Sequence, residues 1–354
     1  MLMAENTMNK TGEYQATEYG PSPETDLKIS IIIPVYKGGD TFRCCVKAME
    51  RLEPSPEEII VVADGGFEKD NPPDEQARLK IIETPFRGGP AKARNIGARA
   101  AKGDILLFID ADVVVEPDIV KRVREIYRDD PELTALMGSY DDNPGQANFL
   151  SQYRNLLHHY VHQNAKENAS TFWGACGAVK RKAFLDLGGF DEKISKPAME
   201  DIEIGYRMKQ HGYRIRLCKN IQVKHLKRWE AISILKTDFF QRALPWTELI
   251  LKYRHFSNDL NIDTSSRVSV MLTFCLILSF LIVPFWPKVM AVTALLTFIL
   301  LYINADLYKF FYRKRGLKFT LMAIPWHWLY FFYSGLGFLL GLGKHKVLRY
   351  IQGD

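Results

Sequence analysis

Two carboxylates separated by one residue follow a buried-type apolar run in this sequence. The run covers 104–109 and ends on Asp110-Ala111-Asp112. Carboxylates this close repel each other unless a cation lies beside them, and hard divalent ions prefer such oxygen ligands and often bridge to substrate phosphates. A metal ion held here would neutralise charge on a leaving diphosphate. The alternative is a solvated acidic turn that carries no chemistry.

Other residues with chemical potential lie further along the chain. Glu200 and Asp201 open a predicted helix, where a carboxylate either takes a proton from an attacking hydroxyl or serves only as a first-turn charge. His225 follows a short predicted strand; it is either a neutral imidazole ligand or a histidine that faces lipid headgroups. Trp173 and Gly174 belong to a Gly-rich segment, which is either one wall of an acceptor site or a place of close packing.

The elements that must position these residues alternate between strand and helix from residue 28 onward. The predicted strands cover 29–33, 58–62, 79–82, 104–109, 214–217 and 221–225, and the predicted helices include 41–51, 90–101 and 148–163. Pro34 is expected to stop the first strand. Continuous β-branched runs between helices predict an α/β fold whose mostly parallel sheet is covered on both faces. Ligands gather at the carboxyl ends of such strands, where Asp64 and Asp110 fall.

Six motifs in this chain resemble, in order and spacing, those of the family 2 glycosyltransferases, which have the GT-A fold. They lie at 31–36, 61–66, 93–97, 102–112, 188–192 and 200–201, so the resemblance covers about residues 28 to 230. Each motif alone is weak, and their common order carries the resemblance. The second strand ends in Ala63-Asp64-Gly65-Gly66 where the family usually has Asp-Asp-Gly-Ser.

The resemblance implies a role for individual residues. Six would contact a nucleotide-sugar donor: Pro34, Tyr36, Asp64, Lys92, Asn95 and Asp110. Two would bind Mg²⁺ or Mn²⁺: Asp112 and His225. Asp201 would be the catalytic base of an inverting transfer. Three neighbours would lie on the acceptor side: Trp173, Gly174 and Glu200.

The C-terminal third of the chain has the composition of a membrane domain. Residues 268–286 contain no charge, and 289–305 and 319–343 are two further apolar runs, the last interrupted by Pro325 and His327. About 20 apolar residues in a helix span a bilayer core. Residues 229–266 mix apolar and basic side chains, which suits helices at a membrane surface. We therefore predict four regions: a disordered segment 1–27, a GT-A domain 28–228, interfacial helices 229–266, and a membrane domain 267–354 with two or three transmembrane segments.

Basic residues predict the orientation of these segments. A cluster between the second and third apolar runs contains Lys309, Arg313, Lys314, Arg315 and Lys318. Because basic loops stay in the cytoplasm, we expect a multi-pass protein of the inner (cytoplasmic) membrane with a cytoplasmic catalytic domain. Three full crossings would put the basic C-terminal tail outside, against this rule. The third segment is then interfacial or re-entrant, or the rule fails here.

The composition and the missing motifs exclude other classes. The net charge is only +6, and no basic element interleaved with aromatic residues indicates a nucleic-acid partner. No G-x-G-x-x-G follows the first strand and no P-loop is present, which disfavours a dehydrogenase or nucleotide-binding regulator. The five cysteines have no zinc-ligand spacing.

These observations predict transfer of one sugar to a hydroxyl of a membrane lipid or lipid-linked saccharide, in cell envelope glycan biosynthesis. The processive members of the family show Gln-x-x-Arg-Trp, whereas this chain has Gln-Arg-Ala-Leu-Pro-Trp at 241–246. The alternative is a polyprenyl-phosphate glycosyltransferase, whose anionic acceptor needs no base. A non-catalytic membrane scaffold is a further alternative, disfavoured by the intact Asp110, Asp112 and Asp201.

Overall fold

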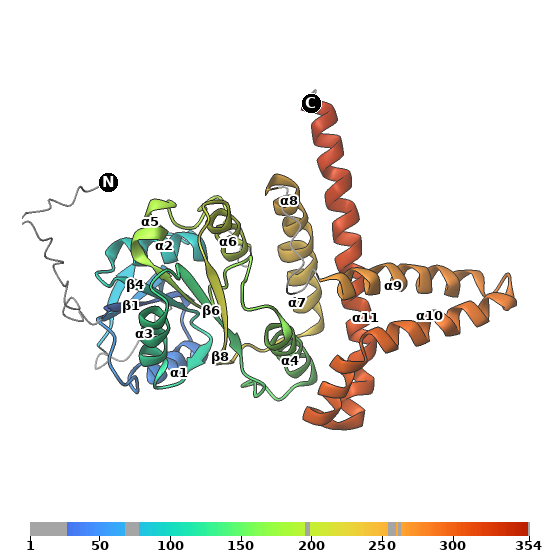
Figure 1. Ribbon diagram of the computed structural model, residues 1–354, viewed down its shortest axis with the longest axis horizontal. Helices are drawn as coiled ribbons and strands as arrows, with labels where there is room; N and C mark the ends of the chain where they lie inside the picture. The colour runs from blue at the N-terminus through green and yellow to red at the C-terminus, as the bar shows by residue number, and fades with distance from the viewer. Residues whose placement is uncertain (1–26, 68–77, 195–198, 254–259, 261–262, 353–354) are drawn as a thin grey trace, which may run out of the picture.

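The computed structural model describes residues 27–67, 78–194, 199–253, 260 and 263–352 (Figure 1). Its strands are β1 (Ile29–Lys37), β2 (Glu58–Phe67), β3 (Lys80–Glu83), β4 (Ile105–Ile109), β5 (Val113–Val115), β6 (Ala135–Tyr140), β7 (Cys176–Lys180) and β8 (Ile215–His225). Helices of the same domain are α1 (Asp40–Met49), α2 (Pro90–Ala100), α3 (Ile119–Asp129), α4 (Phe149–Asn164), α5 (Arg181–Asp186) and α6 (Glu200–Gln210). The disordered segment was predicted for residues 1–27, and residues 1–26 lie outside the described residues.

The strands form one mixed sheet in the order β3-β2-β1-β4-β7-β6-β8-β5. The pairs β3–β2, β2–β1 and β1–β4 are parallel as predicted. The pair β6–β8 is also parallel, although β6 was not predicted. The pairs β4–β7, β7–β6 and β5–β8 are antiparallel, so a mostly parallel sheet is correct only for the first half of the domain. The sequence did not reveal β6 and β7 because each contains a glycine, Gly138 or Gly177, and neither contains a β-branched run.

Two predicted strand boundaries were wrong. β1 continues through Pro34, which is in register with Val62 of β2. The pairing of β1 with β4 ends at Ile32, so the missing N–H of Pro34 interrupts no ladder on that side. The two strands predicted near the end of the domain are one continuous strand, β8.

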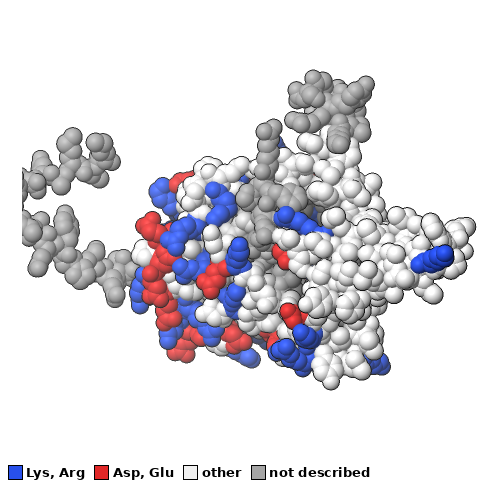
Figure 2. All heavy atoms as spheres, turned by 45° about the vertical axis from the view of Figure 1, so that its right-hand side comes forward, with Lys and Arg blue, Asp and Glu red and all other residues white. Residues whose placement is uncertain are grey.

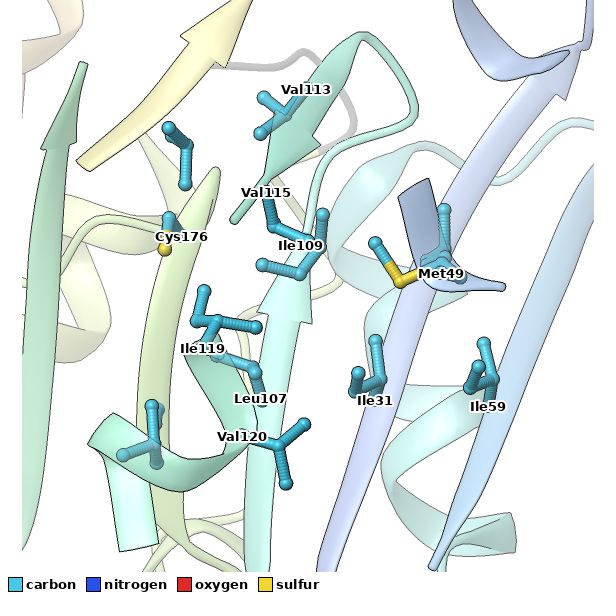
Figure 3. Packing of buried hydrophobic residues seen from close by; sticks show 14 of the residues in the cluster. Ile31, Met49, Ile59, Leu107, Ile109, Val113, Val115, Ile119, Val120 and Cys176 are labelled. Carbon is cyan, nitrogen blue, oxygen red and sulfur yellow. The ribbon is translucent and has the colours of Figure 1, made fainter. Parts of the chain in front are cut away.

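The core lies on both faces of the sheet because successive strand residues point in opposite directions. On one face, Ile31 and Leu107 pack with Val120 of α3 and Met49, which ends α1 (Figure 3). On the other face, Ile32 and Phe108 pack against α2, α5 and α6. This double cover fixes the strands and therefore the positions of the residues that follow them.

Several strand ends converge at one edge of the sheet. The carboxyl ends of β1, β2 and β4 deliver Tyr36, Asp64 and Asp110. β7 runs antiparallel to β4, and Ile109 lies opposite Cys176, so Trp173 and Gly174 reach the same edge just before β7 begins. β5 and β8 pair Val113 with His225, which brings Asp112 and His225 together. The candidate residues therefore meet although they come from distant parts of the chain.

Helices follow the sheet domain to the end of the described chain. They are α7 (Ala231–Lys236), the π-helix η1 (Thr237–Ala243), α8 (Leu244–Tyr253), α9 (Thr264–Ile282), the 3-10 turn η3 (Pro287–Val289), α10 (Met290–Ile303) and α11 (Ala305–Gln352). In Figure 1, α9 and α10 form a hairpin that extends away from the sheet domain, and α11 crosses its base. The predicted interruptions at Pro325 and His327 do not break α11; its helical geometry breaks at Gly316, which has a φ of 81°.

One helix of the described chain, α9, is long and apolar enough to span a membrane. The segments Pro287–Ile303 and Ala305–His345 pass the same criteria only as a pair bent by 64°. These criteria concern length and composition. Figure 2 shows charged side chains spread over the sheet domain, whereas the sides of the hairpin are uncharged and a basic patch marks its far end.

The helix α4 and the segment 229–253 lie between the sheet domain and α11. Leu156 of α4 packs with Phe311 of α11 in a common apolar cluster, so α11 covers the apolar side of α4. Trp229 and Asp238 are buried, whereas Ile232 and Phe240 are exposed. The helices predicted for this segment are present, and their position at a membrane surface stays a prediction.

Candidate functional site

Arg94 is the buried centre of the candidate site. Its guanidinium donates to Asp110 Oδ1 at 2.6 Å and to Glu200 Oε1 at 2.7 Å, and its side chain is 5% exposed. Burial would lower the pKa of Arg94, but these carboxylates raise it, so the guanidinium stays charged. Arg94 therefore links Asp110, at the end of β4, to Glu200, the first residue of α6.

Asp112 lies against His225 on the other side of the acidic pair. The distance from Asp112 Oδ2 to His225 Nε2 is 3.6 Å, and the imidazole stacks on Tyr140 with ring centroids 4.2 Å apart. Burial raises the pKa of Asp112, but the adjacent imidazole and Lys227 outweigh it and hold that pKa below its usual value. Asp112 is therefore an anion, and its neighbour His225 is held in place by stacking on Tyr140.

The residues at this place fit a divalent ion that is completed by substrate. The Asp112 and His225 atoms lie 3.6 Å apart, so both could contact one ion after a small side-chain adjustment. Within the described chain, no group of three or more His, Cys, Asp or Glu side chains could hold an ion alone. An ion here would need further oxygen ligands, which water or a diphosphate can supply.

Asp201 has the surroundings of a general base. Its carboxylate accepts hydrogen bonds from the backbone N–H groups of Gly174, at 3.2 Å, and Ile202, at 2.8 Å. Burial and the nearby Glu200 raise the pKa of Asp201 to about 6, although Arg94 opposes the shift. A carboxylate with this pKa is ionised at pH 7 and accepts a proton more readily than an ordinary aspartate.

Two glycines set the spacing between these groups. A Cβ on Gly174 would lie 3.1 Å from the guanidinium carbon of Arg94. A Cβ on Gly205 of α6 would lie 2.4 Å from the backbone nitrogen of Phe172. The absence of these side chains lets α6 approach the segment before β7, and this approach brings Asp201 within reach of the Gly174 N–H.

On the predicted donor side, Tyr36 and Asp64 face a loop between β3 and α2. The Asp64 carboxylate accepts from the backbone N–H groups of Gly88, at 2.6 Å, and Gly89, at 2.8 Å. The guanidinium of Arg87 lies 4.0 Å from the ring centroid of Tyr36, which is 45% exposed. An exposed aromatic ring with a cation on it is a surface on which a base can stack. The nucleotide roles of Tyr36 and Asp64 stay predictions.

The other predicted donor residues have different surroundings. Asn95 is buried, and its side-chain amide donates to Phe190 O and Glu192 Oε1 and accepts from Phe190 N. Asn95 therefore fixes the 188–192 turn, a packing role that the sequence did not predict. Lys92 is exposed on α2, and Pro34 lies within β1, two residues from Tyr36. Their contact with a nucleotide stays a prediction.

On the predicted acceptor side, a cavity of about 400 Å³ is lined by Trp173 and Asp201 but not by Glu200. Glu200 is 2% exposed and pairs with Arg94, so it acts as a buried counter-ion. Trp173 packs edge-to-face on Tyr140, at 4.8 Å between ring centroids, and forms part of the cavity wall. Gly174 lies behind this wall, against the Arg94 guanidinium.

Sequence reasoning missed Arg94, Tyr140 and Arg87 as parts of the site. Arg94 stood in the quoted motif at 93–97, but its two partners lie 16 and 106 residues away, so the sequence could not show the pairing. Tyr140 ends a strand that was not predicted. Arg87 lies in a Gly-flanked segment just before α2, and an arginine beside glycines was the signal that could have identified it.

Residues 30–188 match the family model described as "Glycosyl transferase family 2". The poly-beta-1,6-N-acetyl-D-glucosamine synthase of Staphylococcus aureus (strain MSSA476) is 26% identical over 203 residues, 53% of this chain and 47% of that protein. The chain thus spans about half the length of this curated relative. An uncharacterized glycosyltransferase of Bacillus subtilis (strain 168), YfnE, is 25% identical over 253 residues, 56% of this chain and 64% of that protein.

A solved structure resembles this chain beyond the sheet domain. It is the mannosyltransferase PcManGT from Pyrobaculum calidifontis in complex with GDP-Man and Mn²⁺, with a TM-score of 0.52 and 16% sequence identity. The similarity covers 92% of this chain and 90% of that one. Such coverage includes helices that follow the sheet. At this level of identity the similarity concerns the fold alone.

Proposed function

We propose that this chain, a family 2 glycosyltransferase with a GT-A fold over its sheet domain, transfers one sugar from a nucleotide-sugar to a hydroxyl of a membrane lipid or lipid-linked saccharide. One observation carries the proposal. The Asp110–Asp112 pair and the Asp201 carboxylate meet at one sheet edge, joined through Arg94 and Glu200, and the cavity beside Asp201 is walled by the C-terminal helices.

Each residue of the site has a separate role in the proposed reaction. The acceptor O–H bond breaks and its proton passes to Asp201, while the acceptor oxygen forms a bond with the anomeric carbon of the sugar. The bond between that carbon and the diphosphate oxygen breaks, and the electron pair leaves with the nucleoside diphosphate. A divalent ion bound by Asp112 and His225 would supply Lewis-acid stabilisation of that leaving group. The ionised Asp201, held by two N–H groups, is oriented for its role before the acceptor arrives.

The transfer of a single sugar is proposed from the sequence at 241–246, which lacks the Gln-x-x-Arg-Trp of processive relatives. The match to a synthase whose name denotes a polymer makes product length an informative measurement. We expect a product that is one sugar longer than its acceptor.

Membrane attachment is proposed through the α9–α10 hairpin. Between Arg267 and Asp306 the only charged residue is Lys288, at the far end of the hairpin. Phe285 and Trp286 beside it are 90% and 61% exposed. Exposed apolar surface of this extent normally marks a membrane or protein interface. The 19 residues of α9 extend about 28 Å, close to the thickness of a bilayer core.

Contacts of α11 support an orientation that satisfies the positive-inside rule. Near its N-terminal end, Arg315 donates to Gln152 Oε1 and to the backbone oxygen of Asp142, both in the sheet domain. Near its other end, Lys344 pairs with Glu248 of α8 at 2.7 Å. Both ends of α11 thus lie on the side of the catalytic domain. We propose that the hairpin enters the bilayer and α11 lies at its cytoplasmic surface, so all basic clusters face the cytoplasm.

The deciding experiment is the Asp201→Asn variant in native membranes with a panel of radiolabelled nucleotide-sugars and Mn²⁺ or Mg²⁺. We expect labelled lipid product from the parent chain. For the variant we expect turnover reduced by about 10²–10⁴-fold with donor affinity unchanged, the contribution typical of a general base. Absence of labelled product from the parent with every donor would exclude the proposed activity. Full turnover in the variant would instead favour the second candidate, transfer to a polyprenyl phosphate whose oxygen needs no base.

A further inference from the structure

The cavity beside Asp201 joins two chemically different surfaces. Its polar end contains Asp201 and Trp173 at the sheet edge. Its other wall contains Val270 and Met271 of α9 and Phe338 of α11, and Met271 is 69% exposed on the hairpin. A ligand that fills the cavity therefore touches the catalytic carboxylate at one end and apolar helices at the other.

The charges around the cavity favour an anion. Three arginines line it: Arg154, Arg242 and Arg267. Arg154 pairs with Asp238 at 2.5 Å, and Asp238 also accepts from the Tyr333 hydroxyl at 2.6 Å. Arg242 forms no hydrogen bond or ion pair with any residue that the structure describes. Three cations and the two carboxylates of Asp201 and Asp238 leave the cavity wall with one net positive charge.

Two imidazoles complete the polar part of the wall. The rings of His158 and His162 are in contact, with centroids 4.0 Å apart and planes tilted by 34°, and both residues line the cavity. Burial holds the pKa of His158 well below its usual range and lowers that of His162 to about 4, so both rings are neutral at pH 7. His158 Nδ1 is buried and has no hydrogen-bond partner among the described residues. Such a group in a built wall indicates a missing polar ligand.

We propose that this cavity binds the acceptor, and that the acceptor is an amphiphile carrying a phosphate group near its reacting hydroxyl. Arg242 binds the phosphate, and the α9 and α11 wall holds the hydrocarbon chain. Asp201 then faces the hydroxyl. This inference rests on the proposed function and adds the class of acceptor to it. A guanidinium suits the task because it donates to two phosphate oxygens at once.

The test measures binding of three probes to the detergent-solubilised full chain: farnesyl phosphate, farnesol and inorganic phosphate. Quenching of tryptophan fluorescence reports occupancy, because Trp173 and Trp246 line the cavity. We expect farnesyl phosphate to bind at least about tenfold more tightly than either other probe, since it alone satisfies both ends. If farnesol binds as tightly as farnesyl phosphate, the cavity does not recognise the phosphate group. If inorganic phosphate binds as tightly as farnesyl phosphate, the cavity binds a free anion and not a lipid.

Variants assign the phosphate to Arg242. Arg242→Gln is expected to weaken farnesyl phosphate binding by about 10–100-fold, the value of one charge-assisted hydrogen-bonding group, and to leave farnesol unchanged. Arg242→Lys should recover part of the loss. The matched control is Arg228→Gln, since Arg228 is exposed, pairs with Glu230 and does not line the cavity. Unchanged binding in Arg242→Gln, or equal loss in the control, would overturn the assignment.

Donor binding, measured in the same samples with a nucleotide-sugar panel and Mn²⁺, separates this inference from the proposed function. Donor binding without a farnesyl phosphate preference would overturn the acceptor class alone. The absence of donor binding would contradict the proposed function, whatever the lipid result.

Discussion

Replacing Arg94 by glutamine removes the cation that the buried Glu200 and the partly exposed Asp110 share. In the parent chain the guanidinium pairs with Glu200, whose side chain is 3% exposed, and with Asp110, whose side chain is 32% exposed. Removing one partner of a buried ion pair costs about 3–5 kcal/mol, because the remaining charge stays desolvated. Water reaches Asp110 in part, so Glu200 accounts for most of this cost.

The expected loss is large enough to measure as a shift in melting temperature. One kcal/mol corresponds to about 2–4 °C for a domain of this size, so Arg94→Gln should melt about 6–20 °C below the parent. The assay is thermal unfolding of the detergent-solubilised full chain, followed by intrinsic fluorescence at pH 7.5 and one scan rate. The double variant Arg94→Gln, Glu200→Gln removes the orphaned charge and should recover a substantial part of the shift.

The matched control is Arg99→Gln on the same helix. Arg99 is 57% exposed and lies 3.5 Å from Glu192, and an exposed pair of this kind contributes about 0–1 kcal/mol. If Arg94→Gln has the same melting temperature as Arg99→Gln, Arg94 does not act as a buried ionic bridge. Failure of the double variant to recover stability would refute the assignment of the cost to Glu200.

Four further predictions follow from the site and the hairpin. Because Asp201 must be ionised to accept a proton and has a pKa of about 6, kcat/KM should fall about tenfold per pH unit below pH 6 and be level above pH 7. Asp112→Asn should weaken Mn²⁺ binding in the presence of nucleoside diphosphate by more than about 100-fold, beyond the effect of an outer-shell group. Gly174→Ala places a methyl 3.1 Å from the Arg94 guanidinium and should cost about 1–3 kcal/mol in a melting experiment. A cysteine in place of Lys288 should react with an impermeant maleimide added outside intact cells.

Each of these has a control and a contradicting result. A rate that stays constant from pH 5 to 8 would exclude Asp201 as the base, and unaltered Mn²⁺ binding would exclude Asp112 as a ligand. Gly343→Ala is the control for the methyl, because nothing lies within 4 Å of its Cβ position. Lys236→Cys, on α7, should react only after the cells are permeabilised; reaction of both cysteines from outside would contradict the orientation.

The sequence predicted those parts of the site that follow directly from one strand. β4 is a continuous apolar run, so its end, and with it Asp110 and Asp112, could be located from the pattern of residues. The meeting of Asp112 with His225 depended on a resemblance, because the pairing of β5 with β8 joins segments more than a hundred residues apart. The Arg94 bridge was not predictable by either route.

The remaining errors have physical causes as well. β6 and β7 are held by their neighbours in the sheet rather than by their own β propensity, so a short run such as Ala135–Tyr140 gave no signal. Proline removes a backbone donor, which predicts a strand end at Pro34, but the pairing of β1 with β4 ends at Ile32 and needs no donor there.

The exposed position of Met271, which is both a cavity residue and part of the proposed membrane hairpin, affects how the acceptor would arrive. A lipid could enter from the plane of the bilayer without leaving it, and only the nucleotide-sugar would come from water. The search for the acceptor is then two-dimensional. Its rate would depend on the mole fraction of acceptor in the membrane, not on its bulk concentration. Dilution with inert phospholipid at constant total acceptor should therefore slow the enzyme.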